Sequence, residues 1–168
     1  MPIKTYAVVP LLAAVALVQS SVLSQFSVRG IPFNLMLLMV VSWSLLRGAR
    51  EGMIWGFTGG LALDFLSGAP LGSLSLSLTL TAYLASLGQR TVYRTSPLFP
   101  SLVALVASVV HDSIFLGVLS MTGYAVAWRT SLVHVALPTA LLGSLMIPLV
   151  YRPLAELHRR TMPEETEL

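Results

Sequence analysis

The sequence predicts an all-α membrane protein, a bundle of six transmembrane helices with very little of the chain in water. Of the 168 residues, 55% are hydrophobic and only 10% are charged, whereas a typical soluble domain is about 25% charged. The mean hydropathy is +0.82. A chain of this length has room for about six spans of roughly 20 residues and their short connections. We therefore expect residues 1–168 to form a single transmembrane domain.

Breaks in the apolar pattern give the expected bounds of the helices, which are about 6–27, 32–46, 50–66, 71–89, 97–121 and 131–151. The first apolar run is longer than the apolar region of a signal peptide, which has about 7–15 residues, so we expect a retained helix. Ser20, Ser21 and Ser24 leave a cleavage site as the alternative. Residues 152–168 are expected to form a short cytoplasmic tail.

The third and fourth helices come from one apolar region, residues 52–89, which is too long for a single span of about 20 residues. Glycine and proline in the segment Ser67–Gly72 place a turn in its middle. Residues 73–81 alternate between polar and apolar with a period of two, which is typical of a strand. A lone strand cannot satisfy its backbone in lipid, so we predict a helix there.

The fifth helix continues across Asp112, and the sixth contains Pro138, where a kink is expected because proline frees a carbonyl of the preceding turn. The tryptophans fall near predicted span ends, as interfacial aromatic residues do; they are Trp43, Trp55 and Trp128.

The arginine and lysine residues predict the orientation of the bundle. When the loops are placed alternately on the two sides, eight of the ten basic residues fall on one side, and only Arg29 and Arg129 fall on the other. The positive-inside rule then puts both termini in the cytoplasm and the Ser67–Gly72 turn outside. The basic residues are scattered singly or in pairs, which argues against nucleic acid as a partner.

Asp64 and Asp112 are single aspartates inside otherwise apolar stretches of the predicted spans, where an ionisable group is costly and suggests a function. Both are expected in the outer half of the membrane, at the level of Arg29, Arg129 and His134. Such a polar cluster could hold the helices in register, or it could line a cavity that binds a partner or a ligand. A proton relay is less favoured because no ladder of acidic residues crosses the membrane.

Gly52, Gly56 and Gly60 repeat every four residues, a pattern that lets a facing helix approach closely. Packing inside the bundle is the favoured interpretation, and docking of a partner's helix is the alternative.

The usual signs of catalysis are missing from the sequence. There is no cysteine, and His111, His134 and His158 do not have the spacing of metal ligands. We find neither a nucleophile elbow nor a glycine-rich phosphate loop. The sequence therefore predicts a protein that is not an enzyme and that has no catalytic residue, metal or cofactor.

The run from Gly52 to Gly72 resembles the signature of the rod-shape-determining protein MreD family. That signature reads a Gly-Phe pair, a Gly-Leu pair, an aspartate and then a Pro-Leu-Gly turn. The matching residues are Phe57, Gly60, Leu61, Asp64, Pro70, Leu71 and Gly72. Residues 32–35 also look like the family's start of the second helix, although the family often has aspartate where Asn34 stands.

The resemblance implies a fold related to the substrate-binding subunits of energy-coupling vitamin transporters. It also implies a scaffold in the bacterial cytoplasmic (inner) membrane that acts in cell elongation. The implied partners are MreC and, through the complex, RodA and a penicillin-binding transpeptidase, with MreB filaments coupled from the cytoplasm. A substrate-binding subunit of a vitamin transporter is the alternative function, and an intramembrane enzyme is a more distant one.

Overall fold

The computed structural model describes residues 5–23, 34–89 and 98–161, and all the regular structure in these ranges is helical. The elements are α1 (Thr5–Val18), the π-helical turn η1 (Gln19–Leu23), α2 (Leu35–Arg47), α3 (Ala49–Ser67), α4 (Ser73–Ser86), α6 (Phe99–Met121), the short α7 (Trp128–Ser131), the π-helical turn η2 (Leu132–Ala136) and α8 (Leu137–Thr161). The predicted all-α class is confirmed. The segment with the period of two is helical, as α4.

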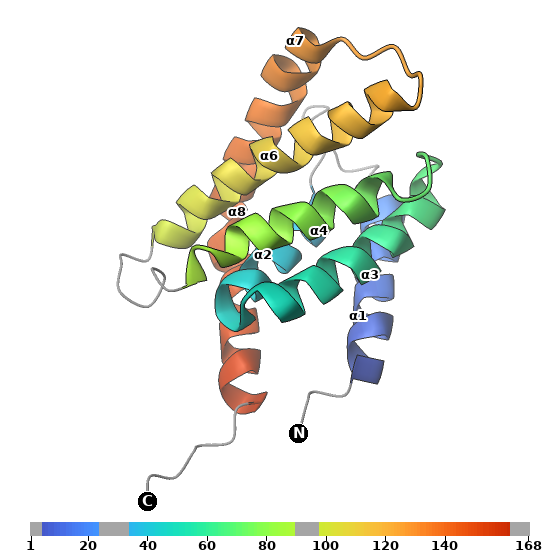
Figure 1. Ribbon diagram of the computed structural model, residues 1–168. Coiled ribbons are helices and arrows are strands. Elements are labelled where there is room, and N and C mark those ends of the chain that lie inside the picture. Colours follow the sequence, from blue (N-terminus) through green and yellow to red (C-terminus); the bar gives the residue numbers. More distant parts are fainter. Residues whose placement is uncertain (1–4, 24–33, 90–97, 162–168) are drawn as a thin grey trace, which may run out of the picture.

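Helix α2 is the centre of the bundle, and it packs against α1, α3, α4, α6 and α8. Every residue from Met36 to Leu46 is buried. A helix that is apolar on all sides needs such an enclosure. α2 continues into α3 through Gly48 alone, whose positive φ of 86° lets the chain turn sharply. In Figure 1, α1 begins and α8 ends at the same lower end of the molecule.

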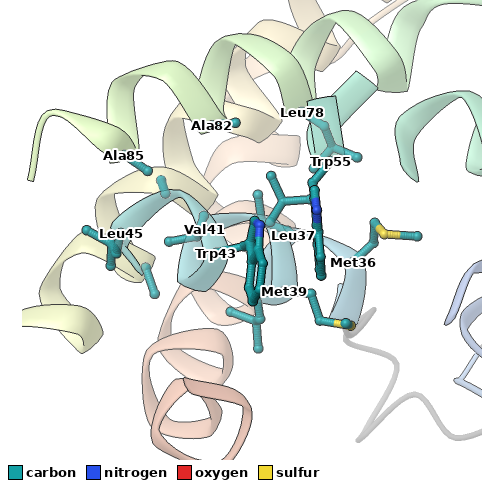
Figure 2. Close-up of a cluster of buried hydrophobic side chains, with 14 of the residues drawn as sticks. Met36, Leu37, Met39, Val41, Trp43, Leu45, Trp55, Leu78, Ala82 and Ala85 are labelled. Carbon is teal, nitrogen blue, oxygen red and sulfur yellow. The ribbon is translucent and has the colours of Figure 1, made fainter. Parts of the chain in front are cut away.

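Trp43 of α2 and Trp55 of α3 stack in the core, with ring centroids 4.4 Å apart and an interplanar angle of 16°. Figure 2 shows the two rings side by side among the side chains of α2. The exposed fractions of Trp43 and Trp55 are 1% and 3%. Trp43 also donates a hydrogen bond from Nε1 to Glu51 Oε2 at 3.1 Å. The interpretation of these two tryptophans as interfacial was therefore wrong, because the tight α2–α3 connection folds them against each other.

The last helix differs from its prediction in length and in shape. α8 continues to Thr161, well past the predicted end at Tyr151, and it contains Pro148 and Pro153. Just before Pro138, the turn η2 is π-helical. Proline has no N–H to donate, so the hydrogen bonding of the preceding turn must rearrange at this point.

Two helices are long and apolar enough to cross a membrane, namely Phe99–Met121 and the continuous stretch Trp128–Arg159, and most of their length is not buried within the chain. Large apolar side chains are exposed along them, including Leu102, Leu145 and Leu149. Contiguous exposed apolar surface of this kind is typical of membrane or protein contact. The apolar helices Val9–Ser21 and Leu35–Arg47 are shorter, so a bundle with six spans stays a prediction.

Candidate functional site

The carboxyl group of Asp64, in the last turn of α3, holds the first turn of α4. Its Oδ2 accepts hydrogen bonds from the backbone N–H groups of Gly72, at 3.0 Å, and Ser75, at 3.1 Å. Its Oδ1 accepts one from the N–H of Leu74 at 3.0 Å and one from the hydroxyl of Ser73 at 3.4 Å. Asp64 is only 2% exposed. Both oxygens act as acceptors, so the carboxyl group works as a cap for α4 from another helix.

The sequence explains why α4 needs a cap from elsewhere. The residue before the helix is Gly72, which has no side chain to accept the free N–H groups of the first turn and has a φ of +93°. The Ser73 N–H and hydroxyl both donate to the carbonyl of Pro70, at 3.1 and 2.7 Å, which closes the turn. The aspartate, proline and glycine of the motif therefore build one structure, the hairpin between α3 and α4.

The glycine face of α3 lies inside the chain. A Cβ on Gly56 would lie 2.8 Å from the carbonyl oxygen of Leu78, and one on Gly60 would lie 2.7 Å from the backbone nitrogen of Ser75. A Cβ on Gly52 would collide with Ser44 of α2. These contacts bring α3 close to the backbones of its neighbours. They leave no room on this face for the helix of another protein.

The other motif residues have different positions. Leu61 is partly buried, and 56% of the surface of Phe57 is exposed.

A polar network joins the turn η1, α2 and α6. Asn34 Oδ1 accepts hydrogen bonds from the N–H of Leu37 at 3.0 Å and from Gln19 Nε2 at 3.2 Å. Gln19 Oε1 accepts one from the N–H of Met36 at 2.7 Å. On its other side, Asn34 Nδ2 lies 3.4 Å from Nε2 of His111, which is 2% exposed. Asn34 therefore caps α2 and connects it to η1 and to α6.

Sequence reasoning did not predict this network. Asn34 directly before an apolar run was a signal for a helix start. Nothing in the sequence indicated that Gln19 and His111 would meet there.

Asp112 follows His111 in α6 and lines a pocket of about 260 Å³. The same pocket is lined by Asn34, His111 and Phe115, and on other elements by Leu74 and Ser131. Oδ2 of Asp112 is buried and has no hydrogen-bond partner among the described residues. The pocket thus combines apolar walls with a few polar groups, which is typical of ligand sites.

The structure does not bring the whole predicted polar cluster together. Asp64 caps α4 in the α3–α4 hairpin, whereas Asp112 lines the pocket. Leu74 belongs to both sites, because its N–H donates to Asp64 and the residue also lines the pocket. Arg129 and His134 are exposed, and no ion pair joins either of them to an aspartate within the described ranges. Arg29 lies outside the described residues. No group of three or more potential metal ligands occurs in the part of the chain that is described.

A comparison with models of protein families shows the family of this chain. The family model of the rod shape-determining protein MreD matches residues 2–161. The chain belongs to the MreD family. Membership implies a role in rod-shape determination, in a membrane-associated family of shape-determining proteins that is not a known enzyme family.

Neither a curated protein nor a solved structure matches the chain. The expected likeness of this MreD-family protein to the vitamin-transporter subunits is therefore without support.

Proposed function

We propose that the chain is a membrane scaffold subunit of the bacterial cell-elongation machinery, which binds MreC and helps to couple MreB filaments to the peptidoglycan synthase, RodA with its penicillin-binding transpeptidase. The family match over residues 2–161 carries the proposal. The polar groups support it, because Asp64 and Asn34 are engaged in holding helices together. A scaffold needs such a rigid bundle, since it acts by positioning other proteins.

The proposal includes six membrane spans, formed by α1, α2, α3, α4, α6 and α8, with both termini in the cytoplasm. α2 has 13 residues, so at about 1.5 Å per residue it is shorter than the roughly 30 Å hydrocarbon core. It is enclosed by other helices and does not have to match the lipid thickness. α1 begins and α8 ends at one end of the bundle (Figure 1), in agreement with an even number of spans.

Cysteine labelling tests this topology, because the natural sequence has no cysteine. Ser67→Cys and Arg50→Cys each place one thiol at an exposed position, at opposite ends of α3. A membrane-impermeant maleimide added to intact spheroplasts should label position 67 and spare position 50 until the membrane is opened. Labelling of position 50 in sealed cells would contradict the proposed orientation.

The outward face of α3 is the proposed contact for the transmembrane helix of MreC. Ile54, Phe57 and Phe65 are exposed on α3, with exposed fractions of 46%, 56% and 70%. Aromatic side chains give a large contact area at a helix interface. Phe57 belongs to the motif but makes no contribution to the buried core, which supports a role outside the fold.

Phe57→Ala is the test of this contact, made in the chromosomal copy of the source bacterium. The expected result is a loss of MreC from the tagged protein in mild detergent, together with rounder cells, at an unchanged level of the variant. Leu145→Ala is the matched control, because Leu145 is 70% exposed on α8, away from α3. Full recovery of MreC with Phe57→Ala, or an equal loss with both variants, would remove α3 as the contact.

A further inference from the structure

The pocket beside Asp112 is the feature that the scaffold role leaves unexplained. It is formed by residues that are far apart in the sequence, from Asn34 at the start of α2 to Ala136 at the end of η2. The polar network does not use Asp112. Asn34 and His111 are bound to each other, and Asn34 is also bound to Gln19. Asp112 Oδ2 has no such partner in the described part of the chain, although it is shielded from solvent.

A buried carboxyl oxygen without a partner is unfavourable, and a donor with positive charge would compensate for it best. The basic residues Arg129 and His134 are exposed and do not line the pocket. An anion would be repelled by Asp112, and a purely apolar ligand would leave its oxygen unsatisfied. Ser131 and Phe115 also line the pocket; a serine hydroxyl can serve as a second acceptor, and an aromatic ring can hold a cation on its face.

We propose that this pocket binds a primary ammonium group on an apolar body, with the ammonium donating to Asp112 and Ser131. The volume of about 260 Å³ corresponds to roughly nine water-sized groups at about 30 Å³ each. This is enough for a small arylalkylamine or for the amine-bearing end of a phospholipid. The source is therefore either a free amine or an ammonium-headed phospholipid, and the pocket chemistry is the same for both. The proposal does not depend on the scaffold role.

The first arm of the test uses a free amine and the purified full chain in phosphatidylcholine nanodiscs. Phenethylamine should raise the unfolding temperature, and phenethyl alcohol, which has the same shape without the charge, should not. Asp112→Asn should weaken amine binding by at least ~10-fold, since hydrogen bonds to charged groups are the strong ones. Ser113→Ala is the matched control, because its hydroxyl bonds to the carbonyl of Val109 within α6 and the residue does not line the pocket.

The second arm uses lipids. The protein is extracted from vesicles with equal parts of phosphatidylethanolamine, phosphatidylglycerol and phosphatidylcholine, and the retained lipid is identified by native mass spectrometry. Preferential retention of phosphatidylethanolamine, lost in Asp112→Asn, assigns the site to a lipid headgroup. Binding of phenethylamine without any lipid preference assigns it to a free amine.

Three results would overturn the proposal. In the first, wild-type protein does not distinguish phenethylamine from phenethyl alcohol and shows no lipid preference. In the second, Asp112→Asn binds phenethylamine as tightly as the wild type does, because the amine then binds elsewhere on the protein. In the third, neither phenethylamine binding nor lipid retention is detected, and Asp112→Asn changes only the recovery of MreC. The pocket would then bind a side chain of MreC.

Discussion

Replacing Asp64 by asparagine should lower the free energy of unfolding by about 2–4 kcal/mol, whereas the same replacement at Asp112 should change it by less than about 1 kcal/mol. Asparagine keeps one acceptor oxygen and puts an NH₂ donor in place of the other. Oδ2 of Asp64 accepts two backbone N–H groups and Oδ1 accepts one, so in either orientation of the amide at least one backbone donor at the start of α4 loses its acceptor. The Ser73 hydroxyl keeps the carbonyl of Pro70 as its acceptor. A buried donor without a partner costs about 1–3 kcal/mol.

Asp112→Asn is a control of the same chemistry in a similar helix. Oδ2 of Asp112 has no hydrogen-bond partner among the described residues, so the amide breaks no bond of the fold there. The assay is thermal unfolding of the two variants and the wild type in nanodiscs, followed by circular dichroism. A loss of 2–4 kcal/mol corresponds to a decrease in Tm of roughly 5–15 °C for a chain of this size.

The cap also makes a local prediction. In Asp64→Asn, amide hydrogen exchange should rise at Gly72, Leu74 and Ser75 and stay unchanged in α2, because only the start of α4 loses its acceptor. Equal Tm values for Asp64→Asn and Asp112→Asn, or unchanged exchange at the three amides, would refute the assignment of Asp64 as the cap.

The remaining predictions concern packing and capping elsewhere, measured by the same unfolding assay. Gly60→Ala should cost about 1–3 kcal/mol because its Cβ would meet the backbone of α4. Gly117→Ala, whose Cβ would have only one neighbour, at 3.9 Å, should be neutral or stabilising by up to about 1 kcal/mol; equal losses at both sites would contradict the close α3–α4 contact. Asn34→Ala should cost about 1–2 kcal/mol through loss of the α2 cap, and Asn34→Asp should keep most of that stability because its oxygens still accept the N–H of the cap; a larger loss with aspartate would argue against capping. Trp43→Phe removes the bond to Glu51 while keeping a ring, and we expect a loss of about 1 kcal/mol; no change would mean that this bond adds nothing to the fold.

Much of the helix pattern could be predicted because it depends on residues that are close together in the sequence. Glycine and proline between Ser67 and Gly72 separated α3 from α4, and the need to satisfy the backbone in lipid identified α4 as a helix despite its alternating sequence. Asp64 was expected at the outer end of α3, one turn before the hairpin. Its hydrogen bonds to residues 8–11 positions later follow from the geometry of that hairpin, which the spacing alone did not give.

The contacts between residues that are far apart in the sequence could not be predicted from it. Asp112 and Arg129 looked equivalent as polar residues of the outer half, yet the structure places one in a pocket and the other on the surface. The difference depends on how α6 packs against α4 and the turn η2. The stacking of Trp43 on Trp55 likewise depends on the single-residue break at Gly48, which bends α3 back onto α2.

The most direct test of the scaffold role is affinity purification of the tagged wild-type protein from its native membrane in mild detergent, with quantitative mass spectrometry of everything retained. The account predicts recovery of MreC in amounts comparable to the tagged protein, together with RodA and its transpeptidase. Recovery of paired ATPases with a shared transmembrane coupling subunit, and no MreC, would contradict the account and indicate a transport complex.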